Sequence, residues 1–183
     1  MIYTIETRSD LAEIQRKLSL LDATVLANEL ARLAVYCQPV TNIVLWLTST
    51  PAENMARFKS RLENMASAKY SAFCQGKEEN VVEDLQALLR ELQAGATSDR
   101  EEMEGLLQIC QTDNICFEQG HYEGYELSVF YCENLSSAFA ECAERLTDCQ
   151  GLVQTLNALL RDDRYGVRDS MLTPALKILA LKA

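Results

Sequence analysis

The stretch TPAENMARFKSRLENM, residues 50–65, decides the fold class, because it carries both the start signal and the periodicity of an amphipathic helix. Thr50 can accept a backbone N–H as an N-cap, Pro51 suits the first helical turn, and Glu53 can reach back to the cap. Apolar side chains then recur at helical spacing, namely Met55, Phe58, Leu62, Met65 and Phe73. The pattern predicts a helix that begins at residue 51 and ends near Gly76.

Helix signals of the same kind lie on both sides of this stretch. A second capping box, Ser98-Asp99-Arg100-Glu101, precedes another apolar series, and Gly95 is placed to end the helix before it. Further helices are expected over residues 9–21, 22–37, 39–47, 77–94, 98–110, 122–146 and 152–160, with a short pair around Pro174. Residues 111–120 are expected to form an irregular loop.

The N-terminal helices carry clear apolar stripes. Asp22 is expected to cap a helix whose stripe faces inward, and the helix that Pro39 begins is expected to be buried on most of its sides. The inward stripe consists of Leu26, Leu30, Leu33 and Cys37.

Composition supports an all-α fold. The 183 residues include only seven Gly and three Pro, which is too few for the many turns of a β-sheet protein. Short connections favour antiparallel neighbours. We therefore expect a single domain over residues 1–183, built as a bundle or an irregular stack of about eight or nine antiparallel helices.

Charge and hydropathy exclude some classes of partner. The chain has 27 acidic and 17 basic side chains, and a net charge of −10 repels the phosphates of nucleic acids. The longest apolar run, residues 43–47, is too short to span a membrane, and the N-terminal residues MIYTIETRSD lack the pattern of a signal peptide. We expect a cytoplasmic protein with reduced cysteines, and neither a nucleic-acid nor a membrane partner.

Two segments resemble a known type of protein. The segment LLDATVLANEL, residues 20–30, with the Pro-started helix that follows, resembles the N-terminal half of uncharacterised bacterial α-helical-repeat proteins. The segment LLRDDRYGVR, residues 159–168, is similar to a helical-hairpin junction in such proteins. The resemblance implies an α/α-superhelical scaffold of unknown function, and it brings no catalytic residues with it.

The segment CQTDNICFEQGHYEGYELSVFYC, residues 110–132, contains the only histidine of the chain. A tetrahedral zinc site can be drawn from Cys110, Cys116, His121 and Cys132. A ligand-binding site or an active site centred on this segment, with Glu123, is the related alternative. Structural zinc sites usually place ligands two to four residues apart, and the chain has no CxxC. We therefore favour buried thiols, and expect no metal, no cofactor and no enzymatic activity.

The same segment also gathers aromatic and acidic side chains, a mixture that suits a contact with a ligand or a protein partner. The candidate contact residues are Phe117, Glu118, His121, Tyr122, Glu123, Tyr125 and Glu126. Packing of the rings in the core is the alternative that we favour, because apolar rings at helical spacing usually face inward.

Two charged clusters offer weaker candidates. The basic stretch of Arg57, Lys59, Arg61 and Lys69 can bind an anionic ligand, but a solvated helix face is the better explanation. The carboxylates of Asp162 and Asp163 can bind a metal, but they also suit the start of a helix. We favour the structural interpretation of both clusters.

The sequence thus predicts a non-enzymatic helical module that binds another protein, as an adaptor, regulator or subunit. A toxin-neutralising immunity-type protein is a special form of this hypothesis. Self-association is also open, since the apolar stripes at Pro39–Leu47 and Tyr122–Tyr131 could be covered by a second copy.

Overall fold

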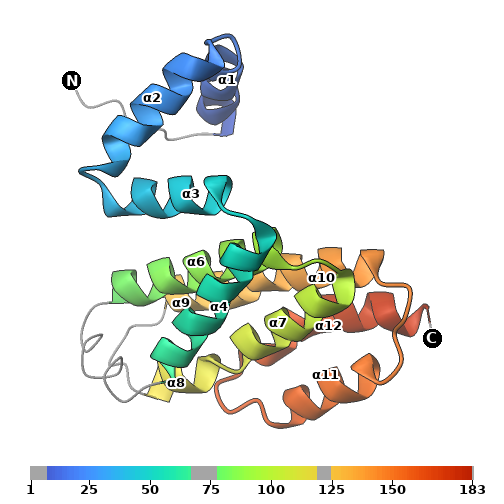
Figure 1. Ribbon diagram of the computed structural model, residues 1–183. Coiled ribbons are helices and arrows are strands. Elements are labelled where there is room, and N and C mark those ends of the chain that lie inside the picture. The colour runs from blue at the N-terminus through green and yellow to red at the C-terminus, as the bar shows by residue number, and fades with distance from the viewer. Residues whose placement is uncertain (1–7, 67–77, 119–124, 183) are drawn as a thin grey trace. The chain divides into compact units, whose positions relative to one another are not determined.

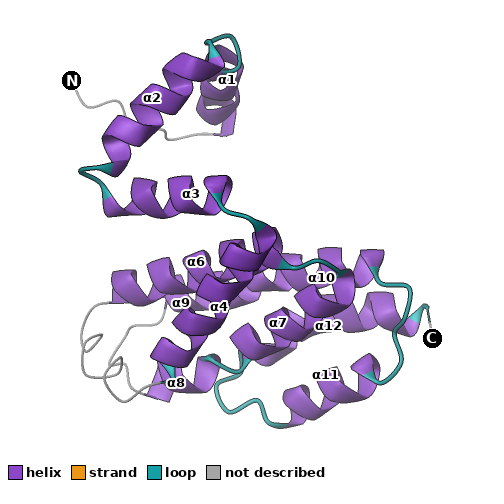
Figure 2. Cartoon of the chain, viewed as in Figure 1, coloured by secondary structure: helices purple, strands orange, loops and turns teal. Residues whose placement is uncertain are grey.

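A computed structural model describes residues 8–66, 78–118 and 125–182, and every regular element in these ranges is a helix (Figures 1 and 2). The all-α prediction is therefore confirmed for the described part of the chain. Within the same ranges, none of the helices combines the length and the hydropathy that a membrane span requires.

The chain is organised as two compact units, Met1–Thr48 and Ser49–Ala183, where the sequence predicts one domain over the whole length. We call them the N-terminal unit and the C-terminal unit. In the N-terminal unit, every side chain described from residue 11 onward is partly or fully exposed, whereas the C-terminal unit encloses a large apolar core. Each unit is therefore described by itself.

The N-terminal unit contains the helices α1 (Arg8–Leu18), α2 (Ala23–Ala34) and α3 (Gln38–Thr48). Asp22 caps α2 as the sequence predicts, because its carboxylate accepts the backbone N–H of Thr24 at 2.8 Å. The Thr41 hydroxyl, in the first turn of α3, contacts the carbonyls of Ala34 and Cys37. This hydroxyl ties the end of α2 to the start of α3.

The C-terminal unit contains the remaining helices in chain order. They are α4 (Pro51–Met65), α6 (Glu78–Gly95), α7 (Asp99–Cys110), α8 (Asp113–Glu118), α9 (Tyr125–Val129), the π-helix η1 (Phe130–Leu135), α10 (Ser136–Arg145), α11 (Leu152–Arg161) and α12 (Arg168–Ala180). Helix α6 packs against α4 and α7, while α12 packs against α10 and α11 (Figure 1).

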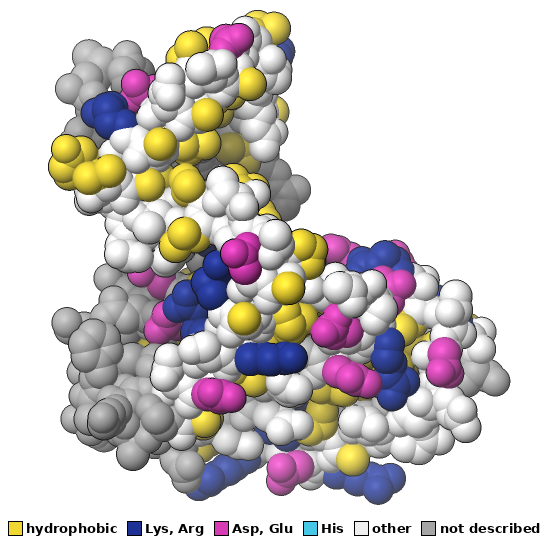
Figure 3. Space-filling model, viewed as in Figure 1, with side chains coloured by type: hydrophobic (Ala, Val, Ile, Leu, Met, Phe, Trp, Pro, Cys, Tyr) yellow, Lys and Arg dark blue, Asp and Glu magenta, His cyan; other side chains and the backbone are white. Residues whose placement is uncertain are grey.

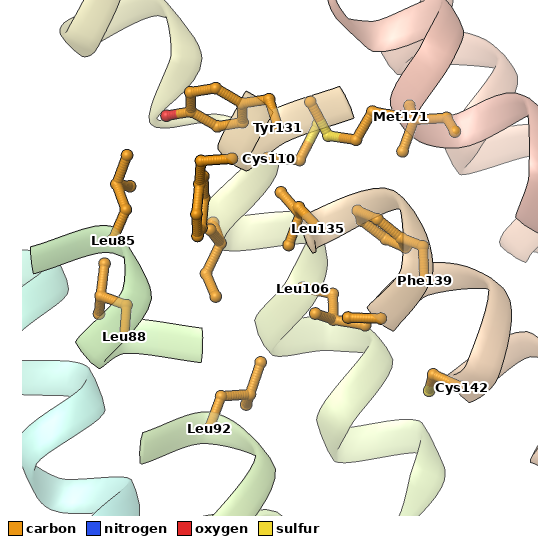
Figure 4. Close-up of a cluster of buried hydrophobic side chains, with 14 of the residues drawn as sticks. Leu85, Leu88, Leu92, Leu106, Cys110, Tyr131, Leu135, Phe139, Cys142 and Met171 are labelled. Carbon is orange, nitrogen blue, oxygen red and sulfur yellow. The ribbon is translucent and has the colours of Figure 1, made fainter. Parts of the chain in front are cut away.

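The core of the C-terminal unit lies between α6, α7, η1, α10 and α12, whose apolar side chains point toward one another (Figure 4). Its fully buried members include Leu85, Leu88, Leu92, Leu106, Cys110, Tyr131, Leu135, Phe139, Cys142 and Met171. The same continuous cluster also includes buried side chains of α4, α8, α9 and α11, so every described helix of the C-terminal unit contributes to one core.

Both predicted capping boxes begin helices. The Thr50 hydroxyl accepts the N–H of Glu53 at 3.3 Å, and the Glu53 carboxylate accepts the N–H of Thr50 at 2.8 Å. At α7, Ser98 accepts the N–H of Glu101 at 3.2 Å, but the carboxylate of Glu101 reaches one residue further back, to the N–H of Thr97. The first helix ends at Met65, with Ala66 as its C-cap, so the predicted end near Gly76 is wrong. Phe73 and Gly76 themselves lie outside the described residues.

The prediction of an irregular loop over residues 111–120 is wrong, because α8 occupies Asp113–Glu118. The long helix expected over residues 122–146 is present within the described part as an unbroken helical run from Tyr125 to Arg145, made of α9, η1 and α10. Its middle is a π-helix, which widens one turn by a residue, and the 3.6-residue pattern of apolar side chains does not reveal it.

The short helical pair expected around Pro174 is instead one helix, α12, with the proline inside it. Proline has no N–H, so the carbonyl of Ser170, four residues earlier, loses its usual partner. The hydroxyl of Ser136 on α10 donates to this carbonyl at 3.1 Å. A neighbouring helix thus replaces the missing hydrogen bond and lets α12 continue.

Two glycines permit close approaches between helices. A Cβ atom at Gly95, where α6 ends, would lie 2.6 Å from the backbone nitrogen of Met55 on α4. A Cβ atom at Gly105 on α7 would lie 2.2 Å from a methyl carbon of Leu92 on α6. The hydrogen of glycine is therefore what lets α6 approach both neighbours.

The end of α10 is closed by a side chain from the end of the chain. Lys182 Nζ donates to the carbonyls of Ala143, Glu144 and Leu146 at 2.9, 2.6 and 2.9 Å. A cation at a helix C-terminus also meets the negative end of the helix dipole.

Candidate functional site

The cysteines of the segment 110–132 belong largely to the core. Cys110 ends α7 and Cys116 lies on α8, and both are buried. Burial, as the largest cause, raises the pKa of the Cys110 thiol to about 12, and it also raises the pKa of Cys132. A thiol that stays protonated near neutral pH is a poor nucleophile, so these positions suit packing better than nucleophilic chemistry.

Tyr131 lies fully buried at the centre of the same region. Its hydroxyl is 2.8 Å from the Thr112 hydroxyl, which in turn donates to the carbonyl of Ile109 at 2.6 Å. Since Thr112 has one proton and gives it to Ile109, Tyr131 donates to Thr112. Burial raises the pKa of Tyr131 well above its usual value. The pair therefore satisfies buried polar atoms and fixes the end of α7.

The aromatic rings of the segment form a packed cluster. The ring of Phe117 lies 5.7 Å from that of Tyr131 and 5.4 Å from that of Tyr165, measured between centroids. Phe130 meets Tyr131 edge to face at 5.3 Å. The core interpretation is confirmed for Phe130 and Tyr131, while Phe117 is half-buried at the edge of the cluster.

An ion pair joins this region to the start of α12. Asp113 and Arg168 are both buried and form a two-pronged pair, and Arg168 also donates to the carbonyls of Leu159 and Asp162. The hydrogen bonds with Asp113 are the largest cause that raises the pKa of Arg168. Both charges are satisfied within the fold, so the pair acts as a structural connection between α8, α11 and α12.

The residues of the candidate partner site fall into three groups. Tyr125, 77% exposed, and Glu126 line a surface hollow of about 320 Å³ beside Val82, Gln86, Val129 and Asn134. Phe117 belongs to the ring cluster instead. The remaining candidates, which are the side chain of Glu118 and residues His121, Tyr122 and Glu123, lie outside the described part of the chain.

The zinc hypothesis concerns Cys110, Cys116, His121 and Cys132, of which His121 lies outside the described residues. Within the ranges that the structure describes, no group of three or more His, Cys, Asp and Glu side chains is arranged to hold a metal ion.

The basic stretch on α4 makes ion pairs with α6. Arg61 binds Asp84 at 2.8 Å and Glu91 at 3.0 Å, and Arg57 lies 3.8 Å from Glu91. These two arginines therefore hold α4 and α6 together. The solvated helix face that the sequence favours is wrong for them, because their side chains are only 31% and 26% exposed and pair with acids of α6. Lys59 is exposed, and Lys69 lies outside the described residues.

Asp163 caps the start of α12, which confirms the capping interpretation. Its carboxylate accepts the backbone N–H groups of Gly166, Arg168 and Asp169 at 2.9, 3.0 and 3.3 Å. Three donors from one turn leave this carboxylate little capacity for a metal ion.

The largest exposed apolar surface lies in the N-terminal unit, where the sequence predicts burial. Neither α2 nor α3 has a buried residue, so the expectations of an inward stripe on α2 and of a mostly buried α3 are wrong. The exposed large apolar side chains are Leu11, Leu18, Leu20, Leu21, Val25, Leu30, Leu33, Val35, Tyr36, Leu45 and Leu47. In the space-filling view, yellow hydrophobic side chains lie open on this unit (Figure 3). Periodicity identifies the apolar side of a helix but does not show what covers it.

Charge is divided unequally between the two units. Residues 1–48 contain five acidic and four basic side chains, which leaves 22 acidic and 13 basic side chains in residues 49–183. The N-terminal unit thus has a formal charge of −1, and the C-terminal unit has −9.

The chain matches no protein-family model, no curated protein and no solved structure, so its function has to be inferred from this geometry.

Proposed function

We propose that the chain is a non-enzymatic interaction protein whose N-terminal unit docks onto a protein partner. The observation that carries this proposal is the distribution of exposed apolar side chains. Among the described residues, eleven of the thirteen large hydrophobic side chains that are exposed lie between Leu11 and Leu47. Contiguous exposed apolar surface is rare on isolated proteins and usually marks a contact site.

The charges buried in the C-terminal unit support a scaffold rather than an enzyme. Arg168 and Asp113 bind each other, Glu91 binds Arg61, and Glu102 binds Arg145. Groups that act as general acids or bases have to reach a substrate. These groups are engaged in bonds that hold helices together.

The proposed contact site therefore differs from the aromatic segment, which the sequence offers as a candidate. Tyr125 and Glu126 line a small hollow, but the apolar surface beside them is limited compared with that of the N-terminal unit. The immunity-type hypothesis is one form of the proposal and stays a prediction.

The proposal is tested by recovering partners of the full-length chain from native lysate. The chain is compared with a variant that carries Leu30→Glu and Leu33→Glu, which places two charges on the apolar surface of α2. We expect the wild-type chain to retain a protein in stoichiometric amount, either another protein or an untagged copy, and the variant to lose it.

Leu181→Glu is the matched control, because Leu181 is 90% exposed but lies in the C-terminal unit. This control should retain the partner. Equal recovery by the wild type and the α2 variant, or no stoichiometric partner for the wild type, would refute the proposal.

A further inference from the structure

The apolar side chains of α1 and α2 are spaced for packing against another helix. They recur alternately three and four residues apart, as in the seam of helices that pack side by side. On α1 and the turn after it these are Leu11, Ile14, Leu18 and Leu21, and on α2 and the turn after it Leu26, Leu30, Leu33 and Cys37. Leu26 and Cys37 are half-buried, whereas Leu30 and Leu33 are 38% and 42% exposed. The row of apolar side chains on α2 is therefore only partly covered by other side chains of the protein.

The exposed apolar area is large enough for a stable interface. The exposed fractions of the eleven side chains between Leu11 and Leu47 correspond to roughly 1,000 Å² of accessible surface, and a standard interface buries about 800 Å² on each partner. Most of the interface could thus be supplied by these side chains alone.

The charges of the N-terminal unit do not select an oppositely charged partner. Residues 11–48 contain three acidic and three basic side chains. Four of them pair within their own helix, since Lys17 binds Glu13 at 2.7 Å and Arg32 binds Glu29 at 2.8 Å. Asp22 caps α2. The surface is therefore apolar with balanced charges, and such a surface is complementary to itself.

The charge of the C-terminal unit restricts how two copies can meet. Two surfaces that each belong to a unit of charge −9 repel each other, whereas two N-terminal units of charge −1 approach with little repulsion. Among the surfaces that the structure describes, the N-terminal unit combines low charge with exposed apolar area.

From these observations we infer that the occupant of this surface is a second copy of the chain, docked through the N-terminal units of both copies. The inference rests on the proposed function and specifies its partner. A two-fold axis brings the same surface of each copy together, so Leu30 and Leu33 of α2 are buried in both. The two acidic C-terminal units then contribute no apolar surface to the contact.

The test measures the mass of the full-length chain in solution, by light scattering and by sedimentation equilibrium, from low micromolar to millimolar concentration. We expect about twice the chain mass of 20.6 kDa. Leu30→Glu with Leu33→Glu should give the single-chain mass, while Leu181→Glu should keep the doubled mass. Circular dichroism verifies that each variant is helical.

A second variant, Leu30→Ala with Leu33→Ala, separates loss of the interface from loss of the fold, because alanine has the highest helix propensity and should preserve α2. It should weaken the dimer by about tenfold or more through the lost apolar area. A wild-type chain that is monomeric throughout the range, or an alanine variant with unchanged dimerisation, would overturn the inference. A monomer that still retains a different protein through α2 would overturn the inference alone and leave the proposed function standing.

Discussion

Asp113 and Arg168 are 55 residues apart and bind each other through two parallel hydrogen bonds in the interior of the C-terminal unit. Arg168 Nε donates to Oδ2 at 2.6 Å, and the neighbouring guanidinium nitrogen donates to Oδ1 at 2.7 Å. The exposed fractions of the two side chains are 0% and 1%. A pair so deeply buried is costly to break, because removal of one partner leaves an uncompensated charge.

Arg168→Met should therefore lower the free energy of unfolding by about 3–5 kcal/mol. The substitution also leaves the carbonyls of Leu159 and Asp162 without their donor. Urea unfolding followed by circular dichroism measures the loss. Arg161→Met, at an exposed position on α11, is the control and should change the stability by less than about 0.5 kcal/mol. Similar losses in both variants would contradict the structural role of the pair.

Ser136→Ala should cost about 1 kcal/mol, because it removes the only donor to Ser170 that the fold offers in place of the proline N–H. Pro174→Ala restores that N–H, so the serine matters less once the proline is gone. A double-mutant cycle in urea measures the coupling between the two positions. Strictly additive effects would show that the Ser136 hydroxyl does not compensate for Pro174.

Gly95→Ala should destabilise the fold more than Gly105→Ala. At Gly95 the added methyl meets the backbone of Met55, which cannot rotate away. At Gly105 it meets the side-chain end of Leu92, which can adjust. We expect a loss of about 1–3 kcal/mol for Gly95→Ala and a smaller loss for Gly105→Ala, measured as free energies of unfolding. The reverse order would refute the close approach of α4 and α6.

The buried cysteines should resist alkylation in the native state. Burial, as the largest cause, raises the pKa of both Cys110 and Cys142 from a usual 9.0 to about 12. A rise of this size leaves about a thousandfold less thiolate near neutral pH. In peptide mass spectrometry after iodoacetamide treatment, Cys149, which is partly exposed, should react before Cys110 and Cys142. Rapid native modification of Cys142 would contradict its burial, and urea should abolish the difference.

Glu53→Gln should reduce stability near neutral pH and have little effect in acid. The hydrogen bond from the Thr50 N–H, as the largest cause, lowers the pKa of Glu53 below its usual 4.5. A group whose pKa falls on folding stabilises the fold above its unfolded pKa, and this contribution is lost as the pH falls through the folded pKa. Unfolding curves at neutral pH and below pH 4 measure the change. Glu63→Gln on the same helix is the control, and a difference that does not depend on pH would contradict the charged cap.

Local signals in the sequence predicted the parts of the fold that depend on neighbouring residues. Thr50, Asp22 and Asp163 each cap a helix, because a capping side chain needs only donors within a few residues of itself. The local pattern around Arg57 and Arg61 favours a solvated helix face instead, because their partners on α6 lie 23 to 34 residues away and leave no local signal.

Features that depend on distant residues could not be predicted in this way. The continuation of α12 through Pro174 requires a hydroxyl 38 residues earlier, and no local pattern around the proline indicates it. The same limit applies to the N-terminal unit. The spacing of Leu26, Leu30 and Leu33 defines an apolar side of α2, but only the folded chain shows that this side is still open.

The contacts of Lys182 also have a consequence for the order in which the protein is made. A ribosome releases the chain from its N-terminus, so the carbonyls at residues 143–146 emerge 36 to 39 residues before the amine that binds them. During synthesis, the carbonyls at the C-terminal end of α10 therefore lack their donor until Lys182 has emerged. The last turn of this helix is completed only after the chain has emerged from the exit tunnel as far as Lys182.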